Sequence, residues 1–449
     1  MKIVSKNFFH YRSQEEACQV GNQKYKIAGG RIRMGYEIEE VEERVILVGV
    51  ADGVMKETED SLDELKELVR TAGATVCGSL LQKREAVHPG TYIGKGKIQE
   101  LKFLIFEKEA TGIVCDDELS PAQMSNLERE LDCKVMDRTL LILDIFAQRA
   151  ISSEGKIQVE LAQLRYRASR LAGLGSSLSR LGGGIGTRGP GEKKLEMDRR
   201  LIRSRITQLK KQLEEVRAHR EIIHAKRGRS NLKTAALVGY SNVGKSTCLN
   251  ELTGSDILAD DMLFATLDTT TRILTLPDKQ EVLLTDTVGF IQKLPHHLVE
   301  AFKSTLEEVL YADIIIHVVD VSNPRMEEQM HVVYETLREL GVNGKPVITV
   351  FNKQDRLEEP VHIKDLNADR TVEASAHTGE GLEELKEALS EILRADQIYV
   401  ERLFPYDQAG RIQLIRKEGQ LLQEEYKENG IEVKAYVPKE LYTKVTGIE

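Results

Sequence analysis

Residues 239–247, GYSNVGKST, fit the pattern G-x-x-x-x-G-K-[ST] of a phosphate-binding loop, and no other feature constrains the fold of this chain as strongly. A short apolar segment, residues 234–238, precedes the loop, and residues 247–252 read as a helix. In this order, backbone N–H groups can curl around phosphate oxygens, and the helix N-terminus adds partial positive charge. The sequence therefore predicts an α/β nucleotide-binding domain in which Lys245 reaches the β- and γ-phosphates and Ser246 holds Mg²⁺.

A second motif, D-x-x-G, ends the apolar segment 282–289. We expect Asp286 to hold Mg²⁺ through water and the N–H of Gly289 to contact the γ-phosphate. Residues 264–272 lie between the loop and this motif, where a first switch segment is expected. A threonine there should complete the Mg²⁺ shell when the γ-phosphate is present. Thr266 is the first choice because it follows Ser246 by 20 residues, and Thr270 is the alternative.

The remaining motifs concern the base. The apolar segment 347–355 ends in N-K-x-D, and a carboxylate at Asp355 can accept from the N1–H and 2-amino groups of guanine. Adenine offers neither donor in that arrangement, so this residue predicts selection of GTP over ATP. Ser375 and Ala376 are expected to place a backbone N–H on guanine O6. Four motifs in this order, each at the end of a strand, predict a GTPase.

The predicted GTP-binding residues are Gly239, Tyr240, Ser241, Asn242, Val243, Gly244, Lys245, Ser246, Thr247, Phe264, Ala265, Thr266, Leu267, Asp268, Asp286, Thr287, Val288, Gly289, Asn352, Lys353, Gln354, Asp355, Ser375 and Ala376, with Ser246 and Thr266 as Mg²⁺ ligands. No residue is assigned as catalytic. Phe290 stands where many GTPases carry a water-orienting glutamine, and a phenyl ring cannot orient water. A further hypothesis is that Asn242 helps to hold K⁺, which would offset transition-state charge.

Charge is distributed unevenly along the 449 residues. Residues 154–230 hold 19 Lys/Arg and 8 Asp/Glu, a net charge of +11, whereas the whole chain carries -9. Within this segment, residues 173–191 include eight glycines, which disfavour a helix, together with Arg180 and Arg188. The pattern predicts two helices joined by a glycine-rich tip that contacts phosphodiester groups. A flexible linker is the alternative interpretation.

The rest of the chain predicts an α/β multidomain protein. Residues 1–150 are assigned to a small parallel α/β domain: residues 1 to about 40 show little periodicity and predict a strand pair or a partly ordered arm, and from Arg44 strands and helices alternate, with a helix 61–69 capped by Ser61 and Glu64. Residues 231–396 hold the GTPase motifs, and residues 397–449 predict a small α+β domain with a hairpin at Asn429-Gly430. The basic segment, taken as 151–230, lies between the N-terminal domain and the GTPase motifs.

Residues 90–97 carry glycines and lysines that favour either a surface loop or a weak phosphate site. No apolar run approaches the ~20 residues of a membrane span, and the cysteines form no C-x-x-C pair, so a cytoplasmic protein is expected.

Several segments together resemble the HflX family of ribosome-associated GTPases: residues 90–96, 159–166, 183–192, 196–203 and 264–268. The resemblance covers residues 40 to 440. It implies an N-terminal α/β domain with a helical hairpin, a GTPase domain and a small C-terminal domain. It also implies binding to the large 50S ribosomal subunit and its rRNA, with splitting of stalled ribosomes in some members. We further expect a monomer.

Two other functions are compatible with the motifs. One is a GTPase of the tRNA-modification type, because Asn242 in the phosphate loop resembles the residue found in that group, although this chain does not end in a catalytic cysteine motif. The other is a nucleotide-gated scaffold that binds the ribosome or RNA and whose hydrolysis is incidental. A turnover assay with and without ribosomes separates these functions.

Overall fold

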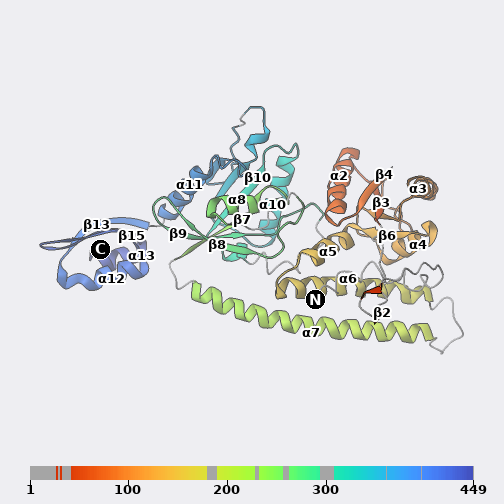
Figure 1. Cartoon of the computed structure of the whole chain (residues 1–449), viewed down its shortest axis with the longest axis horizontal. Helices are drawn as coiled ribbons and strands as arrows, with labels where there is room; N and C mark the ends of the chain where they lie inside the picture. Colours follow the sequence, from red (N-terminus) through yellow and green to blue (C-terminus); the bar gives the residue numbers. More distant parts are fainter. Residues whose placement is uncertain are drawn as a thin grey trace. The chain divides into compact units, whose positions relative to one another are not determined.

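The computed structural model describes residues 27–28, 31–32, 42–178, 190–227, 232–255, 262–293, 308–359, 362–395 and 397–447 (Figure 1). The chain divides into two compact units, Met1–Gln148 and Arg149–Glu449. Parallel and antiparallel sheets that alternate with helices along the chain confirm the α/β multidomain class.

The first unit is built on a parallel sheet of order β4-β3-β5-β6, preceded by a short antiparallel pair, β1 and β2. Its strands are β1 Ile27–Ala28, β2 Arg31–Ile32, β3 Arg44–Ala51, β4 Thr75–Lys83, β5 Gly112–Cys115 and β6 Lys134–Asp137, and its helices are α2 Met55–Thr71, α3 Lys95–Lys108, α4 Pro121–Leu131 and α5 Arg138–Arg149, which ends one residue beyond the unit. The buried strand β3 reads VILVGV, as expected for a strand covered on both faces. Ser120 and Gln123 form a capping box at the start of α4.

The predicted capping box at Ser61 was wrong, because α2 begins six residues earlier, at Met55. Ser61 instead donates its hydroxyl to Asp116 at 2.7 Å, inside the domain. Glu64 pairs with the guanidinium of Arg138, which is 2% exposed and also reaches Asp116 at 2.9 Å. The residues that suggested a helix start therefore belong to a buried polar cluster, in which each charge needs its partner.

The second unit starts with two long helices, α6 Ser153–Leu178 and α7 Pro190–Arg227, which lie side by side (Figure 1). Leu161, Leu209 and Leu213 form their buried contact, and Arg205 binds Glu160 through two bonds of 2.7 and 2.9 Å. The helix runs through Gly173 and Gly175, so the expectation that glycines end it at residue 173 was wrong by five residues. Arg180, Arg188 and most of the glycine-rich tip lie outside the described residues.

The GTPase motifs lie on a six-stranded sheet of order β12-β11-β10-β7-β9-β8, in which only β8 is antiparallel to its neighbour. Its strands are β7 Lys233–Val238, β8 Thr270–Thr275, β9 Glu281–Asp286, β10 Ile314–Asp320, β11 Val347–Asn352 and β12 Arg370–Glu373, and its helices are α8 Lys245–Thr253, α10 Met326–Glu339 and α11 Leu382–Ala395. The four motifs follow or end β7, β9, β11 and β12. Because parallel strands share their carboxyl edge, the motifs meet there.

The chain ends in an antiparallel sheet of order β13-β15-β14 with two helices. Its elements are β13 Gln397–Phe404, α12 Ala409–Glu418, β14 Gln420–Lys427, β15 Gly430–Pro438 and α13 Lys439–Thr446. The predicted hairpin joins β14 to β15, but its turn is Glu428-Asn429, one residue earlier than predicted, because Gly430 already pairs with Lys427. Apolar side chains of β13 and β15 form a core with α12 and α13.

Candidate nucleotide-binding site

The loop after β7 depends on glycines at two positions. Gly239 has φ +155°, and a Cβ there would lie 2.3 Å from the carbonyl oxygen of Val318. Gly244 has φ +96°, and its Cβ would lie 2.4 Å from the side-chain nitrogen of Asn352. At both positions φ is positive and a side chain would clash with a neighbouring atom, so glycine is required for two reasons.

The lysine of the loop points back into it. The Nζ of Lys245 donates to the carbonyl oxygens of Tyr240 at 2.8 Å and Gly239 at 3.3 Å, and the side chain is buried. Burial lowers the pKa of Lys245 to about 8, while the nearby carboxylate of Asp286 acts in the opposite direction. If an anion bound here, Lys245 would donate to it in a charge-assisted contact in place of the two carbonyl oxygens.

Three oxygen groups gather beside the lysine. The Oγ of Ser246 lies 2.7 Å from the Oγ1 of Thr266, and both hydroxyls donate to Asp286 Oδ2, at 2.7 and 2.9 Å. The other carboxylate oxygen, Oδ1 of Asp286, is buried without a protein partner, and burial raises the pKa of this carboxyl. A compact set of hard oxygen donors with an unsatisfied carboxylate oxygen fits a Mg²⁺ ion, whose ligands in an octahedron lie about 3 Å apart. Thr270 begins β8, where it pairs with Asp286 through the backbone.

The phosphate loop also forms hydrogen bonds with two segments that follow it in the sequence. The N–H of Phe264 donates to the Oγ of Ser241 at 2.8 Å, and the N–H of Gln292 donates to the hydroxyl of Tyr240 at 2.7 Å. Phe290 exchanges backbone bonds with Gly239 and Ser241, at 3.1 and 2.7 Å. Thus the loop holds the start of the predicted switch segment and the segment after the D-x-x-G motif, where Phe290 is buried at 3% exposure.

Asn352 connects the phosphate loop to the base-binding motifs. Its side-chain nitrogen donates to the carbonyl of Val243 and its oxygen accepts from the N–H of Ala376, both at 2.8 Å. In this geometry the Ala376 N–H is engaged by Asn352, so its role as a donor to guanine O6 stays a prediction. Asp355 is exposed at the end of the motif, where the Oγ of Ser375 donates to it at 2.6 Å.

Lys353 is held by a residue that the sequence did not single out. Its Nζ lies 2.7 Å from Asp320, at the end of β10, and donates to the carbonyl of Asn242 at 2.8 Å. No motif signals Asp320, because its importance depends on β10 lying between β7 and β11 in the sheet.

The remaining predicted residues fall into two groups. Some are packed or turned toward the protein: Thr287 donates to the carbonyl of Leu237 at 2.6 Å, and Val288 and Leu267 are buried. Asp268 turns away from the phosphate loop, and its carboxylate accepts from the N–H groups of Ile151 and Ser152. The cavity at the phosphate loop is lined by Thr247, Ala265 and Gly289. Gln354 lies in the base-binding motif, directly after Lys353.

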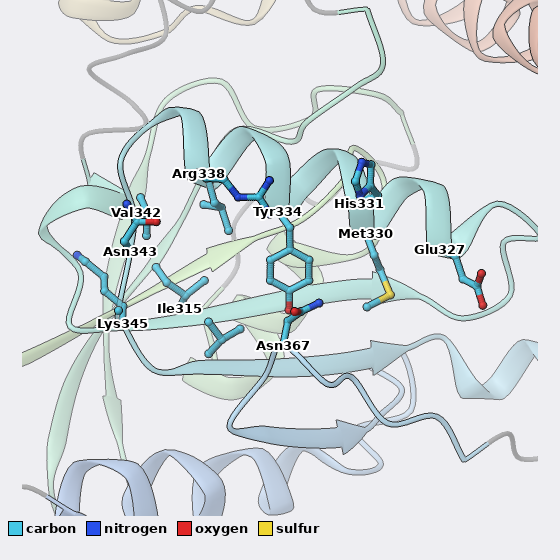
Figure 2. Close-up of a pocket in the computed structure, with 13 residues that line it drawn as sticks. Ile315, Glu327, Met330, His331, Tyr334, Arg338, Val342, Asn343, Lys345 and Asn367 are labelled. Atoms are coloured by element: carbon cyan, nitrogen blue, oxygen red, sulfur yellow. The ribbon is translucent and has the colours of Figure 1, made fainter.

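The cavity between loop and switch has about 50 Å³, room for only a few water molecules. A larger cavity, about 490 Å³, lies beside α10, where the ring of Tyr334 points toward Asn367 (Figure 2). Of the residues that line it, Ile315 is the second residue of β10 and Val347 the first of β11, so this cavity lies at the opposite edge of the sheet from the motifs.

Comparison with known proteins gives three matched regions. Residues 59–147 match the family described as GTP-binding GTPase N-terminal, residues 149–227 the GTP-binding GTPase middle region, and residues 234–353 the 50S ribosome-binding GTPase. GTPase HflX of Lacrimispora saccharolytica is 64% identical over 406 residues, which cover 90% of this chain and 96% of that protein. The chain belongs to the HflX family of GTPases.

The HflX relative from Escherichia coli is 44% identical over 357 residues, covering 79% of this chain and 84% of that protein. Among solved structures, a GTP-binding protein from Sulfolobus solfataricus in complex with GDP is 26% identical, with a TM-score of 0.43, covering 78% of this chain and 98% of that one. As an HflX-family GTPase, the chain hydrolyses GTP. Among the described residues no helix is both long and apolar enough to cross a membrane.

Proposed function

We propose that this HflX-family GTPase binds the large 50S ribosomal subunit and its rRNA in a GTP-dependent way and splits stalled ribosomes. The observation that carries the proposal is the basic hairpin of α6 and α7, in a segment whose net charge of +11 contrasts with -9 for the whole chain. Such a concentration of cationic side chains fits a phosphodiester surface. The match of residues 234–353 to a family described as 50S ribosome-binding supports the same partner.

We assign Ser246 and Thr266 as Mg²⁺ ligands, with Asp286 holding the ion through water. Their oxygens lie together and Asp286 Oδ1 has no protein partner, which favours Thr266 over Thr270. Bound Mg²⁺ would neutralise charge that develops on the β- and γ-phosphates during hydrolysis. Asn242, which has φ +64°, is retained as the candidate for holding K⁺.

The residues of the chain divide the remaining work. Lys245 contacts the β- and γ-phosphates, Asp355 reads guanine, and Asn352 fixes the distance between these two ends of the site. The buried ring of Phe290 neither donates to nor accepts from the attacking water, so the free protein hydrolyses GTP slowly. A group supplied by the ribosome or by another residue then orients the water.

We propose four domains with limits at 1–150, 151–230, 231–396 and 397–449, in a monomeric, cytoplasmic protein. The hairpin would meet rRNA with its glycine-rich tip, and the nucleotide would act on it through the switch segments around Thr266 and Gly289.

Co-sedimentation with purified 50S and 70S particles tests this function. We expect more protein in the pellet with a non-hydrolysable GTP analogue than with GDP. Binding should weaken by about 0.7–0.9 log units per phosphate contact for each decade of salt. Replacing residues 180–191 by a Ser/Gly linker should abolish binding and splitting while GTP affinity is retained. If that variant still binds and splits ribosomes, the hairpin is only a linker and the proposal fails.

A further inference from the structure

The start of α6 is completed by a side chain far away in the sequence. The carboxylate of Asp268 accepts from the N–H groups of Ile151 and Ser152 at 2.9 and 2.7 Å and from the Oγ of Ser152 at 2.5 Å. The N–H of Gly155 in turn donates to the same Oγ at 2.8 Å. Since the first N–H groups of a helix have no partner within it, Ser152 is the N-cap of α6 (Ser153–Leu178), and the carboxylate of Asp268 holds this capping residue in place.

The contact is close enough to require a glycine in the first turn of the helix. A Cβ on Gly155 would lie 2.5 Å from the Oδ1 of Asp268 and 3.1 Å from the Oγ of Ser152. Any other residue would push the carboxylate away. The same turn is fixed from α7, because Arg220 pairs with Glu154, which also accepts from Gln158 at 3.0 Å.

Asp268 is only two residues from Thr266, separated by the buried Leu267. Two residues span at most about 7 Å, so the position of the carboxylate limits that of the Thr266 hydroxyl. The other end of this segment is fixed by the bond from Phe264 N–H to Ser241. The predicted switch segment is therefore fastened to the phosphate loop at one end and to α6 at the other.

We propose that Ser152 and the N–H groups at the start of α6 position the switch for GTP hydrolysis. They hold Asp268, and through it they hold the Thr266 hydroxyl against Ser246 and Asp286. Asp268 contacts neither of these residues, so it is a positioning residue and not a ligand. This inference rests on the proposed role of Thr266 as a Mg²⁺ ligand.

The test compares four variants of the full chain: Ser152→Ala, Asp268→Ala, Ser152→Thr and Ser153→Ala. For each, kcat, KM for GTP, the Mg²⁺ concentration at half-maximal rate and GDP affinity are measured. Loss of one charge-assisted bond should lower kcat and raise the Mg²⁺ requirement about tenfold in Ser152→Ala, and more in Asp268→Ala, with GDP affinity without Mg²⁺ unchanged. Ser152→Thr keeps the hydroxyl and should restore parental values. Ser153→Ala, at the exposed neighbouring position, should match the parent.

A lower melting temperature with unchanged kcat and Mg²⁺ requirement in Ser152→Ala would show a purely structural cap and overturn the proposal. Circular dichroism shows whether Asp268→Ala is folded, and if it is not, Ser152→Ala and Ser152→Thr decide. Thr266→Ala separates the two levels of the argument. If it leaves the Mg²⁺ requirement unchanged, the metal assignment itself fails. If it raises that requirement while Ser152→Ala does not, only the anchoring role fails.

Discussion

Removing the side chain of Asn352 should damage stability and nucleotide binding together. The amide is 2% exposed and bridges the Val243 carbonyl to the Ala376 N–H, with both bonds at 2.8 Å. Val243 and Ala376 are themselves buried, so Asn352→Ala leaves two groups unpaired away from water. Each such group costs about 1–3 kcal/mol, and the two together lower the free energy of unfolding by about 2–6 kcal/mol.

Nucleotide affinity should fall because the phosphate loop and the base-binding loop lose their common support. If the loss of one of the two bonds weakens nucleotide binding by about 1.4 kcal/mol, the Kd for GDP rises about tenfold. Urea unfolding and titration with a fluorescent GDP analogue measure the two effects. Asn367→Ala removes an exposed asparagine side chain and is the matched control. A cost below about 1 kcal/mol, or equal losses of affinity in both variants, would refute the reasoning.

Asp355→Asn should weaken GTP binding and improve xanthosine triphosphate binding, because each hydrogen bond to guanine that is lost in the complex leaves a desolvated group unpaired at a cost of about 1–3 kcal/mol; unchanged GTP affinity in a competition assay would contradict the assignment. Burial lowers the pKa of His317 to about 4 from an ordinary 6.5, so the unfolded chain binds a proton first and stability falls as pH drops from 6.5 to 4, by about 3 kcal/mol. Urea midpoints of the parent and His317→Gln against pH test this: the parent should lose more than the variant, and parallel curves would count against it. Without ribosomes, GTP turnover should be of the order of 10⁻² s⁻¹ or less, faster in K⁺ than in Na⁺; a fast rate that is equal in both salts is the contrary result.

The sequence predicted those parts of the site whose geometry is local. A phosphate loop is one continuous turn between a strand and a helix, so its residues and spacing are enough to recognise it, and the D-x-x-G and N-K-x-D motifs likewise end their own strands. The basic hairpin followed from charge and apolar spacing. Its first helix runs longer than predicted, because two glycines weaken a helix by only about 1 kcal/mol each and do not by themselves end it.

Contacts between distant segments were not predictable in this way. Ser61 and Glu64 match a capping pattern, yet the fold uses them to balance Asp116 and Arg138 in the interior. The pair of Asp320 with Lys353 depends on strand order, and the bond of Ser152 to Asp268 joins residues 116 positions apart with no shared motif. Such contacts become visible only when the strands and helices have been placed.

The contact of Asp268 with the residues just before α6 also has a thermodynamic consequence. The carboxylate of Asp268 connects two elements, because Asp268 follows the segment that holds Thr266 and its carboxylate binds Ser152, the residue before α6. If a nucleotide changes the affinity of the hairpin for a partner through this contact, the partner must change the affinity for that nucleotide by the same factor, because linkage between two sites is reciprocal. If GTP in place of GDP strengthened the hold of the hairpin on RNA about tenfold, RNA on the hairpin would have to favour GTP over GDP by the same factor, about 1.4 kcal/mol. The ribosome would then act as a selector of nucleotide through the hairpin, without touching the guanine site.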